Sequence, residues 1–208
     1  MDSPRILSGL SDYLGGPELG QWRSAGFVVS RVISQNLGSG YPSDNLKPPF
    51  LVDEDRYTLS AYFVHPSIIC TTGRTVAQVS SQGLGSNLYI QTTQDPDTSL
   101  LVPRQETNLR GSNWTEGQCF FSMGRHYWYD LEKDMNCGDI FPVFLLYNGG
   151  QLTGFGWAMV NDVRSVRYEH PPSALIRLFI KNPPRCLFDA EALSAMHIYL
   201  NDALFNLC

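Results

Sequence analysis

The segment from Phe141 to Val160 constrains the fold more than any other part of the chain. The pair Asn148-Gly149 lies there between two apolar runs. Asn-Gly between apolar runs favours a type I′ β-turn, whose two central residues both have positive φ. We therefore predict an antiparallel hairpin with strands at about 141–147 and 150–159.

The glycines of the second run bear on the register of this hairpin. With a turn at Asn148-Gly149, Phe141 faces Gly156, so that a bulky side chain lies over a residue without one. A turn at Gly149-Gly150 would change the partners, since a shift of one residue moves every side chain to the other face.

Other alternating or β-branched runs indicate further strands. They lie at residues 27–33, 57–64, 75–80, 88–92 and 196–200. Turn-forming residues separate most of them, a spacing typical of sandwiches and barrels rather than of βαβ units. Residues 173–181 are apolar and fit either a strand or a short helix. The fold class expected is mostly β: an antiparallel β sandwich or barrel with short helical segments.

The length of 208 residues suits one domain, because all-β units of this size commonly stay undivided. We therefore expect residues 1–208 to form a single β-rich domain. Residues 1–24 are rich in glycine and proline and fit an irregular N-terminal arm. The sequence contains no internal repeat and no low-complexity tract.

The charge balance argues against nucleic acid as a partner. Lysine and arginine total 15 against 20 acidic residues, which gives a net charge of −5. Binding to phosphates requires clustered cationic side chains, and the basic residues here form no run. No window approaches the ~20 continuous apolar residues of a membrane-spanning helix. A homo-oligomer is compatible with the sequence.

Five cysteines bear on the compartment: Cys70, Cys119, Cys137, Cys186 and Cys208. They form no C-x-x-C pair, so neither a zinc knuckle nor a thioredoxin-like motif is present. We predict disulfides Cys186–Cys208 and Cys119–Cys137 and an unpaired Cys70. Such bridges are typical of secreted proteins.

Two further features concern secretion. Asn113-Trp114-Thr115 is an acceptor sequence for N-glycosylation. Residues 1–5 lack the apolar run of a signal peptide. The chain is therefore either cytosolic as written or a mature secreted sequence, and the cysteines and Asn113 favour a secreted or extracellular protein.

The densest group of functional side chains lies between Cys119 and Asp139. His126, Tyr127, Trp128 and Tyr129 form a surface that can stack on a sugar ring or another flat ligand. Alternation along a strand places the two tyrosines on one face and His126 with Trp128 on the other. We expect the latter pair to bind the ligand and the tyrosines to pack inward, although core packing explains either face equally well.

Catalytic alternatives start from the same segment. Asp130, Glu132, Asp134 and Asp139 offer carboxylates for a glycosidase-type pair, but acidic residues spaced in this way commonly lie on solvated turns. The four histidines form no H-x-H or H-x-x-x-H pair, so no metal site is predicted. No G-x-S-x-G nucleophile elbow is present, and no cofactor is expected.

These observations favour a secreted, non-catalytic binding protein over an enzyme. The ligand expected is a glycan or a small apolar molecule. The alternatives are a hydrolase or metal-dependent enzyme centred on His126 with nearby carboxylates, and a structural or storage extracellular protein.

Overall fold

The computed structural model describes residues 27–34, 41–43, 48–53, 56–69, 71–83 and 85–208. The chain is mostly β, with two antiparallel sheets and short helices, which confirms the predicted fold class. The described residues divide into two compact units, one within 1–34 and 48–104 and the other within 35–47 and 105–208. The single domain therefore stays a prediction. Cys70 lies outside the described residues, as does the whole of the predicted N-terminal arm, residues 1–24.

The first unit contains one five-stranded sheet with the order β1-β3-β4-β5, in which β2 also pairs with β3. Its elements are β1 (Phe27–Ser34), β2 (Leu51–Asp53), β3 (Arg56–Tyr62), α3 (Pro66–Ile69), α4 (Val76–Gln82), β4 (Leu88–Gln91) and β5 (Ser99–Val102). Leu59, Leu88 and Ile90 are fully buried in this unit. The strands expected near 27–33, 57–64 and 88–92 are confirmed.

The strand expected at 75–80 is wrong, because this segment forms helix α4. Thr75 caps the helix: its hydroxyl oxygen accepts a hydrogen bond from the Gln78 backbone N–H at 3.2 Å, and the Gln78 side chain accepts one from the Thr75 N–H at 2.8 Å. This reciprocal capping box satisfies two N–H groups that a helix start otherwise leaves without partners. This local capping outweighs the β propensity of Val76 and Val79, which depends strongly on context.

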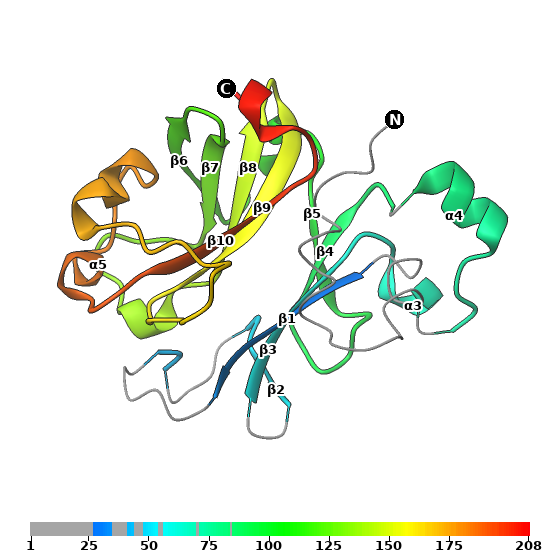
Figure 1. Ribbon diagram of the computed structural model, residues 1–208, viewed down its shortest axis with the longest axis horizontal. Coiled ribbons are helices and arrows are strands. Elements are labelled where there is room, and N and C mark those ends of the chain that lie inside the picture. Colours follow the sequence, from blue (N-terminus) through cyan, green and yellow to red (C-terminus); the bar gives the residue numbers. More distant parts are fainter. Residues whose placement is uncertain (1–26, 35–40, 44–47, 54–55, 70, 84) are drawn as a thin grey trace. The chain divides into compact units, whose positions relative to one another are not determined.

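The second unit is built on a five-stranded meander in which each strand pairs with the next (Figure 1). Its strands are β6 (Trp114–Phe120), β7 (Gly124–Tyr129), β8 (Val143–Asn148), β9 (Gln151–Met159) and β10 (Ser194–Tyr199). Its helices are the 3-10 helices η1 (Glu106–Leu109), η2 (Cys137–Asp139), η3 (Ser173–Leu178) and η4 (Ala203–Phe205), and α5 (Cys186–Asp189). The strand expected at 196–200 is confirmed as β10.

The hairpin β8–β9 is at the centre of this sheet, and its strands are confirmed. Its turn is shifted by one residue from the expected position: Asn148 pairs with Gln151, and Gly149 and Gly150 have φ values of 57° and 76°. A further register shift between Leu146 and Tyr147 then places Phe144, and not Phe141, opposite Gly156. Gly-Gly satisfies the two positive φ values at lower steric cost than Asn-Gly.

The disulfides join different partners from those expected. Cys119 bonds to Cys208, and Cys137 bonds to Cys186, so the predicted pairs Cys186–Cys208 and Cys119–Cys137 are wrong. The four cysteines that were predicted to form disulfides all do so, although with other partners.

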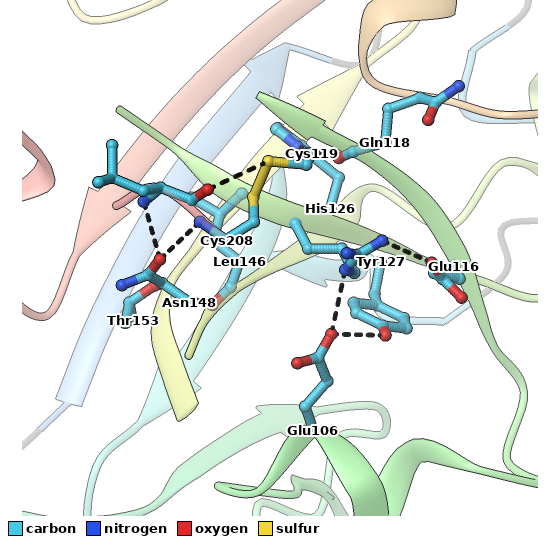
Figure 2. Close-up of polar contacts among 12 residues, drawn as sticks. Glu106, Glu116, Gln118, Cys119, His126, Tyr127, Leu146, Asn148, Thr153 and Cys208 are labelled. Atoms are coloured by element: carbon cyan, nitrogen blue, oxygen red, sulfur yellow. Dashed lines mark hydrogen bonds and ion pairs between the residues drawn. A yellow bond between two sulfur atoms is a disulfide. The ribbon is translucent and has the colours of Figure 1, made fainter. Parts of the chain in front are cut away.

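The course of the C-terminal segment explains why Cys208 bonds to Cys119. After β10, at one edge of the sheet, the chain turns through η4 and passes the turns of the hairpins β8–β9 and β6–β7. There Ser122 N–H donates to Asn206 O at 3.0 Å, and the Asn148 side chain accepts from the N–H groups of Leu207 and Cys208 at 2.8 and 2.7 Å (Figure 2). This route brings Cys208 to β6, at the opposite edge, and not to Cys186.

Among the described residues, no helix combines the length and the apolar composition that a bilayer crossing demands.

Candidate functional site

A cavity of about 460 Å³ opens between the segment around η1 and the strands β6 and β7. Its walls are both charged and aromatic, and they carry hydroxyl groups as well. The lining residues are Glu106, Thr107, Leu109, Arg110, Gly111, Ser112, Trp114, Glu116, Arg125 and Tyr127. We call it the Arg125 cavity.

Arg125 of β7 joins two carboxylates in this cavity. Its Nη1 lies 2.7 Å from Glu116 Oε1, and its Nε lies 3.4 Å from Glu106 Oε1. The two glutamates come from different elements, β6 and η1. One guanidinium can hold both because its N–H groups form a rigid planar fork.

Tyr127 completes this polar group from the same face of β7. Its hydroxyl donates a hydrogen bond to Glu106 Oε1 at 2.8 Å (Figure 2), and its ring packs edge-on against Tyr147 with centroids 5.4 Å apart. Burial, followed by the hydrogen bond to Glu106, raises the pKa of Tyr127 well above its ordinary value. The hydroxyl is therefore a fixed donor at neutral pH.

Glu116 has a second cationic partner outside the lining. Lys181 Nζ lies 2.7 Å from Glu116 Oε1, the same oxygen that Arg125 contacts. The hydrogen bond from Lys181 is the main cause that lowers the pKa of the Glu116 carboxyl, and Arg125 acts in the same direction. Glu116 is thus an ionised acceptor at neutral pH.

Trp114 supplies the aromatic part of the cavity wall. Its ring packs edge-on against Tyr129, with centroids 5.0 Å apart, and against Phe141 at 6.3 Å. Tyr129, one of the four aromatic residues singled out in the sequence, therefore supports Trp114.

The other face of β7 carries His126 and Trp128, as the alternation predicts. They are 1% and 6% exposed, and their rings are stacked with centroids 6.4 Å apart. His126 Nδ1 donates to Gln118 O at 3.2 Å and Trp128 Nε1 donates to Phe179 O at 3.3 Å. Of the four aromatic candidates, Tyr127 lines the Arg125 cavity, whereas His126 and Trp128 are enclosed.

A second histidine faces His126 within this enclosed layer. His197 of β10 lies with its ring centroid 6.4 Å from that of His126, and Phe144 packs against both rings. Burial lowers the pKa of each histidine to about 4, and their mutual repulsion contributes to the shift of His126. Both rings are neutral at pH 7. The carboxyl group of Glu169 lies beside this pair, with its Oε1 3.8 Å from His197 Nδ1.

The carboxylates between Cys119 and Asp139 do not gather around His126. Asp134 lies 3.5 Å from Arg185 Nε, and Asp139 accepts a hydrogen bond from the Ser43 hydroxyl at 3.3 Å. Asp130 and Glu132 are exposed. Within the described part of the chain, no three His, Cys, Asp or Glu side chains come together as a metal site.

Sequence reasoning missed Glu106 and Glu116 as members of the site. Glu116 pairs directly with Tyr127 across β6 and β7, so a predicted β6–β7 hairpin with a register would have placed it on the Tyr127 face. Glu106 belongs to a 3-10 helix outside the sheet, and no spacing rule connects it with Arg125. The chain matches no family model, no curated protein and no solved structure.

Proposed function

We propose that this chain is a secreted, non-catalytic protein that binds a glycan in the Arg125 cavity. The observation that carries the proposal is the arrangement of Glu106 and Glu116 on one arginine beside an aromatic wall. Sugar hydroxyls both donate and accept hydrogen bonds, and such a site offers them acceptors and donors in fixed positions. Oriented polar groups in a concave site are the usual source of ligand specificity.

The polarity of the cavity favours a glycan over a small apolar molecule. Arg125, Glu106 and Glu116 are ionic, and an apolar ligand would have to remove water from them without replacing its hydrogen bonds. Such desolvation is costly when no new partner is supplied. A sugar can replace that water and at the same time contact the ring of Trp114.

Two glutamates in one cavity also suggest a hydrolase, which is the second candidate. Glycoside hydrolysis needs one protonated carboxyl as general acid. The lowered pKa of Glu116 opposes that role, and Glu106 Oε1 already accepts a hydrogen bond from Tyr127. The lowered pKa of Glu116 and the hydrogen bond to Glu106 therefore both favour binding over catalysis.

Secretion and glycosylation at Asn113 belong to the same proposal. The two disulfides are typical of oxidising compartments. Asn113 and Thr115 are exposed, which suits an acceptor site. Asn113 lies between Ser112 and Trp114, both of which line the cavity, so an attached glycan would lie at its rim.

The proposal is tested by applying the labelled full-length chain to an array of immobilised glycans. We expect binding to a restricted set of glycans. The Arg125→Gln variant should bind them at least about tenfold more weakly, since a hydrogen bond to a charged group contributes about 1.5–3 kcal/mol. Glu132→Gln, an exposed acid outside the cavity, is the matched control and should bind as the unmodified chain does.

Two results would contradict the proposal. One is an array without any bound glycan, and the other is equal binding by Arg125→Gln. Turnover of 4-nitrophenyl glycosides that is abolished in Glu116→Gln would instead support the hydrolase.

A further inference from the structure

A second cavity, of about 290 Å³, lies elsewhere in the same unit and has a different charge. Its lining residues are Lys133, Arg177, Asn182, Pro183, Arg185 and Phe188. Three of these six side chains are cationic and none is acidic, although the whole chain has a net charge of −5. We call it the basic cavity.

Covalent and backbone contacts hold the walls of the basic cavity together. The Cys137–Cys186 disulfide joins η2 to α5, and the Arg185 backbone N–H donates to Lys133 O at 3.2 Å. These contacts keep Lys133 and Arg185 beside each other although they are distant in sequence. The fold thus places two cationic side chains in the lining of one cavity.

The cations of the basic cavity are incompletely neutralised by the protein. Arg185 has Asp134 at 3.5 Å, but both side chains are 76% exposed, and solvent weakens such a pair. Arg177 lies over the ring of Phe188, with its Cζ 5.0 Å from the centroid. Among the described residues, no carboxylate forms an ion pair with Lys133 or Arg177.

We propose that the basic cavity binds a tetrahedral oxyanion, a sulfate or phosphate group. Two guanidinium groups and one ammonium group supply donors suited to several oxygens of one anion, and the Asn182 amide adds a neutral donor. Three cations in one small cavity match a single anionic group rather than an extended polyanion, which requires a longer basic surface. This proposal is independent of the glycan in the Arg125 cavity.

The test is a titration of the ¹⁵N-labelled full-length chain with sodium sulfate and with sodium phosphate, followed by amide chemical shifts. Ionic strength is held constant with sodium chloride, because salt screens exposed charges. We expect saturable shifts at Lys133, Asn182 and Arg185. Arg177→Gln and Lys133→Gln should each weaken binding by about three- to fivefold, the upper part of the range typical of exposed ion pairs.

Arg164→Gln is the matched control, because this exposed arginine pairs with Asp162 and lies outside the basic cavity. It should leave the titration unchanged, and melting temperatures should agree among all the variants. Shifts that do not saturate, that occur at other residues, or that persist unchanged in Arg177→Gln and Lys133→Gln would overturn the proposal.

The source of the anionic group is distinguished by two further ligands, phenyl phosphate and glucose 6-sulfate. Tighter binding of phenyl phosphate than of free phosphate indicates a phosphomonoester as the ligand. Tighter binding of glucose 6-sulfate than of free sulfate indicates a sulfated sugar. Equal affinities within both pairs indicate that the free ion is the ligand.

Discussion

Acidification from pH 7 to pH 4 is expected to lower the free energy of unfolding by several kcal/mol through His126 and His197. Each has a pKa of about 4 in the folded chain, against about 6.5 in an unfolded one. Between these values the unfolded chain binds more protons, so stability falls as the pH falls. A difference of this size corresponds to roughly 3 kcal/mol for each ring.

The titratable groups beside His126 and His197 change this pH dependence of stability only in part. Glu169 is 3.8 Å from His197, and partial burial raises the pKa of its carboxyl. Glu169 is therefore protonated over part of the same pH range and compensates a charged His197 weakly. Tyr199, stacked on His197 with centroids 5.8 Å apart, has a pKa raised to about 12 by burial and stays neutral.

Urea unfolding at several pH values, followed by tryptophan fluorescence, measures this dependence. The His126→Phe variant should show about half the slope with pH between 6.5 and 4, because one of the two titrating rings is removed. His65→Phe, in the first unit, is the matched control and should retain the full slope. A free energy of unfolding that is constant from pH 7 to pH 4.5 would contradict the buried, neutral histidine pair.

Replacement of Gly156 by alanine is expected to destabilise the second unit by about 3 kcal/mol or more, at the upper end of overpacking effects. A Cβ at this position would overlap both the Phe144 ring and the Met196 carbonyl oxygen. Phe144 lies directly opposite on β8 and Met196 belongs to β10. The substitution therefore forces apart β9 and both of its neighbours.

Gly154→Ala provides a graded comparison on the same strand. Its Cβ would lie 3.0 Å from Ile198 O and 3.1 Å from Leu146 Cδ1, so smaller movements relieve the contact. We expect this variant to lose less stability than Gly156→Ala in thermal and urea unfolding. Equal losses in the two variants would show that the register of Phe144 and Gly156 is wrong.

The hairpin β8–β9 was predictable because local chemistry determines it. Its two apolar runs and its Asn-Gly-Gly turn favour an antiparallel pair of strands through neighbouring residues alone. The turn position was less certain, since Asn148-Gly149 and Gly149-Gly150 both allow positive φ. The helix α4 was also readable: Thr75 and Gln78 have the spacing of a capping box, a signal that the β-branched residues obscured.

The disulfide partners and the site depend on contacts between distant segments. Cys208 reaches Cys119 because Asn148 and Ser122 bind the chain end on its way across the sheet. Glu106 reaches Arg125 because η1 lies beside β7. Alternation along β7 correctly places Tyr127 and His126 on opposite faces of the sheet. Which of these faces borders a cavity depends on the segments packed against each of them, and the sequence does not show those contacts.

The hydroxyl of Tyr127 provides the most direct test of the Arg125 cavity. Isothermal titration with a glycan identified on the array should give about fivefold weaker binding for Tyr127→Phe, because the hydrogen bond that holds the Glu106 carboxylate in place is lost, a contribution of about 1 kcal/mol. The melting temperature should remain within a few degrees of that of the unmodified chain. Unchanged affinity in Tyr127→Phe, with the glycan still bound, would contradict the proposal that this cavity is the binding site.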